Sequence, residues 1–329
     1  MSAPASTIRR LQQGSPWLER NRPLVIAGSL ILLILLVAGL RNPGFVSSNN
    51  LRNQLVLASF LGIAAAGQTI LILTGGIDLS LAWNLNFSAV LMTQIVRHSQ
   101  SPSQVTWAIA VALFSAMVVG FINGIGVAYL RIPSLVMTLG MNAVLLGLTL
   151  VYTGGTPQGT APGIIIDLAT ARIAGIPWAV LLWIVISAVL IFILRRTVFG
   201  RQLYAIGNNP RASYLSGVPV RRVLVASYTI AGLLAGITGL LYTGYSNQSF
   251  LRMGDGFVLP AIAAVVIGGT SILGGSGGYI GTIFGAIIVT LLQNVLSIEG
   301  FKQAEQQMLF GGIVLVMLLL YGRESRIRE

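Results

Sequence analysis

The chain has 329 residues, of which 55% are hydrophobic and only 9% are charged. A soluble domain carries roughly a quarter of charged residues, so this composition excludes a soluble globular protein and indicates a polytopic membrane protein. The net charge of +12 does not indicate a nucleic-acid partner, because the arginines lie between apolar stretches rather than in one patch. The absence of cysteine excludes disulfides, thiolate metal ligands and cysteine nucleophiles.

The two ends of the chain are polar. Residues 1–22 contain Arg9, Arg10, Arg20 and Arg22 and lack the short apolar core and small-residue cleavage site of a signal peptide. We therefore expect 1–22 to be a retained cytoplasmic tail and 322–329 to be a second one. Residues 23–321 between them form one transmembrane domain.

A membrane-spanning helix needs about 20 predominantly apolar residues. By this criterion the sequence predicts an all-α fold of about ten transmembrane helices, near 23–40, 54–74, 80–96, 104–129, 133–153, 176–195, 223–245, 256–273, 278–297 and 306–321. Glycines interrupt the segments around 74–82 and 254–278, which we expect to be half-helices or re-entrant segments. With the N-terminus inside, most arginines fall in the inner loops, and both termini are then cytoplasmic.

The two halves of the chain share a pattern. Residues 73–80 and 267–275 each end an apolar run in a pair of glycines. Paired breaks in two halves are typical of transporters built from inverted repeats around a pathway at the membrane midplane. The alternative is that these glycines only allow close helix packing, as glycine commonly does in membrane helices.

The most basic loop, 195–222, contains a short helix with clear start and stop signals. Asn208 or Asn209 can cap a helix that begins at Pro210, and Gly217 can end it in the left-handed conformation, followed by Pro219. The predicted helix, 210–216, is far too short to cross a membrane. We expect it to dock into a groove of a cytoplasmic partner.

The sequence also bears on the source of energy. The single lysine, Lys302, lacks the glycine-rich loop of a phosphate-binding site, so the chain carries no such ATPase motif. An ion-coupled carrier usually places ionisable groups within its spans, and here only Asp78 and Asp255 lie close to one. We therefore favour a transporter driven by a separate ATPase subunit. The alternative is an ion-coupled secondary transporter of a small polar solute.

At this point several motifs, in order, carry a family resemblance. They include residues 76–80 (Gly-Ile-Asp-Leu-Ser), 123–133, 138–140, 153–155, 199–201, 205–212, 216–218 and 261–275. Together they resemble the permease subunits of ribose-type ABC importers for monosaccharides, over nearly the whole chain. Two segments depart from the usual pattern: 81–84 brings a bulky Trp83, and 258–260 is apolar where acidic residues are common.

The resemblance implies a bacterial inner-membrane permease that forms a dimeric pore with a second copy or a paralogue. It implies a cytoplasmic ATPase subunit that binds ATP and Mg²⁺, a periplasmic sugar-binding protein, and no cofactor on this chain. It also implies that the ATPase contacts the coupling segment, whose residues are Gly207, Asn208, Asn209, Pro210, Arg211, Ala212, Tyr214, Leu215, Ser216 and Gly217.

A sugar pathway should be lined by uncharged hydrogen-bonding groups and some aromatic rings. Our candidates are Gln68, Asp78, Trp83, Asn84, Asn86, Asn123, Asn142, Tyr245 and Asn247. An amide in hydrocarbon must find a partner or face a wet cavity, so the alternative role of the amides is hydrogen bonding between helices. For Asp78 we favour a cap of the following helix over a gate.

Overall fold

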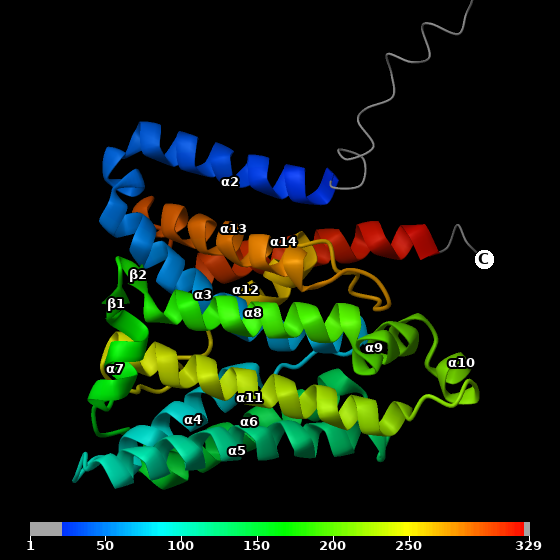
Figure 1. Ribbon diagram of the computed structural model, residues 1–329, viewed down its shortest axis with the longest axis horizontal. Helices are drawn as coiled ribbons and strands as arrows, with labels where there is room; N and C mark the ends of the chain where they lie inside the picture. Colours follow the sequence, from blue (N-terminus) through cyan, green and yellow to red (C-terminus); the bar gives the residue numbers. More distant parts are fainter. Residues whose placement is uncertain (1–21, 326–329) are drawn as a thin grey trace, which may run out of the picture.

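The computed structural model describes residues 22–325, which form a bundle of helices lying mostly side by side (Figure 1). The predicted tails lie largely outside this range. The last helix continues to Ser325 and therefore runs past the predicted boundary at 321.

Each predicted span coincides with a helix. The first half contains α2 (Arg22–Arg41), the short 3₁₀ helix η2 (Pro43–Val46), α3 (Ser48–Leu73), α4 (Leu81–Ile95), α5 (Pro102–Ala128) and α6 (Ser134–Thr153). The second half contains α7 (Gly163–Thr170), α8 (Trp178–Arg196), α9 (Val198–Asn208), α10 (Pro210–Leu215), α11 (Val220–Ser246), α12 (Val258–Ile267), α13 (Tyr279–Ile298) and α14 (Gln303–Ser325).

A small hairpin interrupts this helical pattern. Strands β1 (Arg172–Ile173) and β2 (Ile176–Pro177) pair antiparallel, with Ile173 opposite Ile176. The turn residues Ala174 and Gly175 both have positive φ, as a tight two-residue hairpin requires. The helix predicted from residue 176 therefore begins only at Trp178.

Within the described residues, six helices are long and apolar enough to cross a membrane: α3, α5, α6, α8, α11 and α13. Helix α4 has 15 residues and α12 has 10, which at about 1.5 Å per residue falls short of a bilayer core of about 30 Å. Both short helices adjoin the segments where glycines predicted a break. The two interrupted segments are thus half-helices, as the glycines predicted, and the count of about ten spans is not confirmed.

The order of long and short helices occurs twice, in opposite directions. Helix α3 is followed by the non-helical segment 74–80, then short α4 and long α5; helix α11 is followed by 247–257, then short α12 and long α13. In Figure 1, α3 runs from the end that carries α7 (the α7 end) to the end that carries α10 (the α10 end), and α11 runs the other way. This arrangement is the one that inverted repeats produce.

The glycine pairs of the sequence pattern are not the equivalent positions of this repeat. The Gly275 N–H donates to the Leu73 carbonyl at 3.0 Å, so the two pairs meet at the same end of the bundle. Positions related by an inverted repeat lie at opposite ends. The matching interruptions are 74–80 and 247–257, which no shared glycine motif marks.

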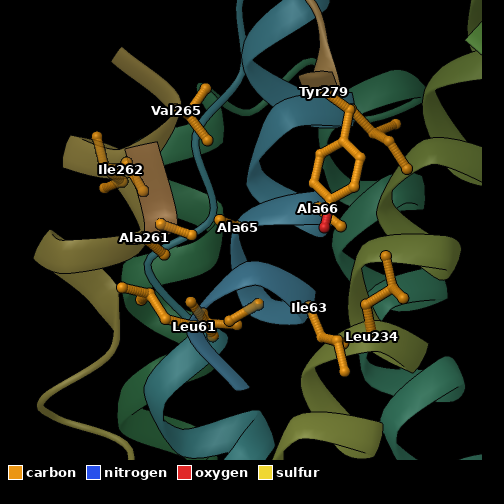
Figure 2. Close-up of a cluster of buried hydrophobic side chains, with 14 of the residues drawn as sticks. Leu61, Ile63, Ala65, Ala66, Leu234, Ala261, Ile262, Val265 and Tyr279 are labelled. Carbon is orange, nitrogen blue, oxygen red and sulfur yellow. The ribbon is translucent and has the colours of Figure 1, made fainter. Parts of the chain in front are cut away.

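Helix α3 lies at the centre of the bundle. Its apolar window is 89% buried, whereas that of α6 is 17% buried. Figure 2 shows Leu61, Ile63, Ala65 and Ala66 of α3 between side chains of α11, α12 and α13. Small residues make this possible: Gly67 faces the backbone of Ala231 on α11, which a larger residue would push away.

Helices α12 and α13 approach even more closely. Gly285 lies against the Ala264 carbonyl, and Gly281 lies against the Gly268 carbonyl. A methyl group at either glycine would meet main-chain atoms, which cannot rotate aside. The short α12 is therefore held to α13 by backbone contact.

We expect Gly285→Ala to destabilise the protein by roughly 1–3 kcal/mol, because the two helices must separate to admit the methyl group. The apparent melting temperature of the detergent-solubilised protein measures this. Gly147→Ala is the control, since open space surrounds Gly147 in α6 and alanine favours a helix. Equal melting temperatures for the two variants would contradict the packing argument.

Candidate functional site

The first candidate site is the segment that links α8 to α11. Helix α9 begins at Thr197, whose hydroxyl oxygen accepts from the Gly200 N–H at 3.2 Å. Leu203 and Ile206 of α9 are buried and Arg201 is exposed. We predicted no separate helix here. The spacing of Phe199, Leu203 and Ile206 after a capping threonine is the signal that could have revealed it.

Helix α10 forms where the sequence predicted it, one residue shorter. The Asn209 side chain accepts from the Ala212 N–H at 2.9 Å, and Pro210 is the first helical residue. At the other end the Gly217 N–H donates to the Tyr214 carbonyl and the Val218 N–H donates to the Ser213 carbonyl, both at 3.0 Å. With φ of 82° at Gly217, these bonds make the Schellman motif that ends many helices.

The surface of α10 is unusually open. Tyr214 is 71% exposed and Leu215 is 79% exposed, and Pro210, Arg211, Ala212 and Ser216 are exposed as well. Figure 1 shows α10 projecting beyond the ends of the long helices. An apolar pair on a projecting, capped helix is suited to insertion into a groove of another protein.

Behind α10, the end of α9 is wedged between the two glycine pairs. Gly207 lies against the Leu73 carbonyl and the Gly275 N–H, with no room for a side chain. The Asn208 amide donates to the carbonyls of Tyr204 at 2.9 Å and Gly275 at 3.3 Å. Three segments, the ends of α3 and α9 and the loop 268–278, therefore meet at one junction.

Tyr204 adds a further bond to this junction. Its hydroxyl donates to the Gly277 carbonyl at 3.1 Å. Burial raises the pKa of the Tyr204 phenol, against an opposing effect of nearby Arg195, so the hydroxyl keeps its proton at physiological pH. Any displacement of α9 must therefore move the loop before α13 as well.

The second candidate site is the non-helical segment 74–80, which runs from the junction into the bundle. The Gln68 amide nitrogen donates to the Asp78 carbonyl at 2.6 Å, and its oxygen accepts from the Asp78 N–H at 3.3 Å. From α6, the Thr138 hydroxyl accepts from the Leu79 N–H at 3.0 Å. Side chains thus replace the helical hydrogen bonds that this buried backbone lacks.

Asp78 is buried, and its carboxylate is occupied locally. It accepts from the Ser80 N–H at 2.7 Å and from the Ser80 hydroxyl at 2.6 Å, and the Asn123 amide donates to the same hydroxyl at 2.9 Å. Ser80 is the N-cap residue of α4 and makes no side-chain cap bond, so Asp78 forms an Asx turn before the helix and is not the cap that we favoured. The salt bridges among the described residues are Arg41–Glu299 and Arg252–Asp255, and neither involves Asp78.

The other amide candidates on α4 connect helices. Asn84 is fully buried and donates to the carbonyls of Ala116 at 3.3 Å and Gly232 at 3.4 Å, which joins α4 to α5 and α11. The Asn86 amide donates to the Phe250 carbonyl at 2.8 Å. Trp83 packs among buried apolar side chains. These contacts fit the alternative role of hydrogen bonding and packing between helices.

The remaining candidates lie apart from this network. Tyr245 and Asn247 are near the α7 end, where Tyr245 packs edge-on against Phe60 with ring centroids 5.8 Å apart. Asn247 ends α11 with φ of 62° and accepts from the Ala161 N–H. Asn142 is half-buried on α6. The structure thus unites Gln68, Asp78 and Asn123, adds Ser80 and Thr138, which we had not proposed, and leaves the others separate.

We expect Gln68→Leu to destabilise the protein, because it strips both backbone groups of Asp78 of their partner at about 1–3 kcal/mol each. Gln54→Leu on the same helix is the control, since neither polar atom of buried Gln54 has a partner among the described residues. Thermal unfolding in detergent compares the two. A control variant that loses as much stability as Gln68→Leu would refute the assigned role of the Gln68 amide.

The comparisons with known proteins cover nearly all of the chain. Residues 50–319 match the family described as branched-chain amino acid transport system / permease component. The ribose import permease protein RbsC of Escherichia coli (strain K12) is 34% identical over 94% of this chain and 95% of its own. RbsC of Bacillus subtilis (strain 168) is 34% identical over 90% and 91%. The L-arabinose ABC transporter permease protein AraH of Azospirillum brasilense is 29% identical over 95% and 92%. No solved structure matches significantly.

Proposed function

This chain belongs to the family of branched-chain amino acid transport system permease components, and we propose that it forms the membrane path of an ABC importer for a monosaccharide. It is a transport subunit and not an enzyme, with ATP hydrolysis on a separate subunit. The observation that carries the proposal is the capped, exposed helix α10 joined through α9 to both glycine pairs.

The chemistry of the interior supports a sugar over an amino acid. A branched-chain amino acid carries an ammonium and a carboxylate, and each would need a partner of opposite charge away from water. Among the described residues, Asp78 is the one buried charged side chain, and its carboxylate already accepts a hydrogen bond from the Ser80 hydroxyl. Neutral amides and hydroxyls fill the other buried polar positions, as transport of a neutral pentose or hexose requires. The relatives named for ribose and arabinose support the same class.

The distribution of charge supports an orientation in the bacterial inner membrane. The α10 end carries seven basic residues: Arg131, Arg195, Arg196, Arg201, Arg211, Arg221 and Arg222. The α7 end carries six: Arg41, Arg52, Arg97, Arg172, Arg252 and Lys302. With the seven arginines of residues 1–22 and 322–329 on the α10 side, the excess of positive charge supports a cytoplasmic α10 end. The α7 end then faces a periplasmic sugar-binding protein.

Coupling follows from the contacts at the junction. The ATPase subunit binds α10 through Tyr214 and Leu215, and its movement on binding ATP and Mg²⁺ displaces α9. Gly207, Asn208 and Tyr204 pass this displacement to the end of α3 and to the loop before α13. A second permease, identical or paralogous, completes the pore. An ion-coupled carrier needs a titratable group free to exchange ions, and the Asp78 carboxylate, which accepts two hydrogen bonds from Ser80, is poorly suited to that role.

The Tyr214→Ala/Leu215→Ala double variant should lose the ATPase subunit. Both side chains are exposed, and exposed aromatic residues often dominate binding, so we expect the apparent affinity to fall about tenfold or more. Co-purification from native membranes with mass spectrometry measures recovery of the ATPase. The control is Val151→Ala/Tyr152→Ala near the α7 end, because Val151 is 85% exposed and Tyr152 is 51% exposed. Undiminished ATPase recovery by the α10 variant would overturn the docking assignment.

Gly207→Ala should separate docking from transport. The methyl group meets the Leu73 carbonyl and the Gly275 backbone, so α9 must move off the junction while the surface of α10 is unchanged. We expect normal ATPase recovery with sugar uptake reduced at least tenfold in reconstituted vesicles. Gly140→Ala, in open space on α6, serves as the control. Normal uptake by Gly207→Ala would show that the junction does not transmit the movement.

A further inference from the structure

A cavity of about 420 Å³ opens at the α7 end, inside this single chain. It is bounded by α3, the end of α11, the segment 247–257, α13 and the start of α14. Its volume lies within the range of about 300–1,000 Å³ that is typical of sites for small molecules.

One wall of the cavity is a polar stripe on an otherwise apolar helix. Thr290, Gln293, Asn294 and Ser297 of α13 follow the i, i+3, i+4, i+7 spacing that places side chains on one helical face. Ser297 is already paired, because its hydroxyl donates to the Gln293 carbonyl and accepts from Gln306. A continuous polar face on a membrane-spanning helix needs hydrogen-bond partners, because lipid provides none.

Two side-chain atoms of the stripe have no hydrogen-bond partner among the described residues. The Thr290 hydroxyl, on a residue that is 4% exposed, and the Asn294 side-chain oxygen both lack a hydrogen-bond partner there. A buried polar group without a partner destabilises the fold. The hydroxyl is a donor and an acceptor, and the amide oxygen is an acceptor. Both atoms are buried, so alcohol groups in the cavity can pair with them once the two side chains change rotamer.

Three aromatic residues also line the cavity. The rings of Tyr242 and Phe257 pack edge to face with centroids 5.1 Å apart, and Phe250 lies against Tyr242 at 6.4 Å. These rings add an apolar surface to the amides and hydroxyls of the lining. An apolar and aromatic lining with a few polar groups is the usual composition of a small-molecule site.

The cavity lining is also electrically neutral apart from its rim. Arg252 is the one charged residue that lines it, and its guanidinium donates to the Asp255 carboxylate at 2.7 Å. This hydrogen bond raises the pKa of Arg252, and the side chain is 77% exposed to solvent. A zwitterion or an anion would find no free counter-charge deeper in the cavity.

We propose that this cavity is a binding subsite for a neutral, polyhydroxylated molecule the size of a monosaccharide. Its alcohol groups pair with Thr290 and Asn294, and its C–H face rests on Tyr242 and Phe257. The inference rests on the proposed import of a sugar and adds that each permease holds the sugar within its own helices. The subsite lies at the end where the binding protein would release its cargo.

The test uses the full chain in nanodiscs, without the ATPase or a binding protein. Equilibrium dialysis with radiolabelled ribose, arabinose, xylose, glucose and galactose, and with leucine for comparison, measures binding. At least one aldose should bind weakly and leucine should not. The Thr290→Val/Asn294→Leu double variant should weaken binding at least fivefold. The control is Thr282→Val on the same helix, whose hydroxyl faces Thr69 and not the cavity.

Two results would overturn the subsite: a folded permease that binds none of these aldoses, or one whose binding is unchanged in the double variant. Elution as a single species in size exclusion and a retained melting temperature establish that each variant is folded. Uptake by the complete importer is measured separately. Aldose uptake without binding by the permease refutes the subsite and leaves the proposed function standing, whereas absence of uptake of any aldose refutes the function.

Discussion

The structure depends on one constraint: main-chain groups inside a membrane protein must find partners, because lipid offers none. Segment 74–80 leaves the helical pattern in the interior of the bundle, and its amides cannot pair within a helix. Gln68 supplies both a donor and an acceptor to Asp78, and Thr138 accepts from Leu79. These side chains come from α3 and α6, so the break in the backbone requires both helices to stay in place. The non-helical segment 74–80 therefore connects α3 to α6.

The same constraint explains why glycine gathers at the junction below α9. Gly207 fits against the Leu73 carbonyl, and the Gly275 N–H pairs with that same carbonyl. Main chain contacts main chain from three segments, and no side chain separates them. Such contacts cannot relax by a change of rotamer, so a movement of one segment is passed on to the other two. This rigidity is what the proposed coupling to an ATPase requires, and α10 provides the exposed surface at which the movement would begin.

Sequence reasoning succeeded where the relevant chemistry is local. Apolar length located the helices, and the series Asn209, Pro210, Gly217 located α10, because capping and chain termination depend on adjacent residues. It missed α9, which is too short and too polar for a span, although its apolar spacing after Thr197 was a usable signal. It also could not find the partner of Gln68, because that partner is the main chain of Asp78, ten residues further on and beyond the end of α3. For Asn84 the open question was which way the amide faces, and only packing of α4 against α5 and α11 answers that.

The two ends of the bundle differ in a way that suits transport. At the α10 end, hydrogen bonds and glycine contacts hold α3, α9 and the loop before α13 together. At the α7 end, a cavity lies beside Thr290 and Asn294, whose buried side-chain oxygens have no partner within the described residues. Helix α3 reaches both places, and α13, which lines the cavity, follows directly on the loop of the junction. A displacement that enters at α9 can therefore change the shape of a cavity on the opposite side, because α3 and the segment leading into α13 connect the two. This physical link would let ATP hydrolysis at one face control the affinity for sugar at the other.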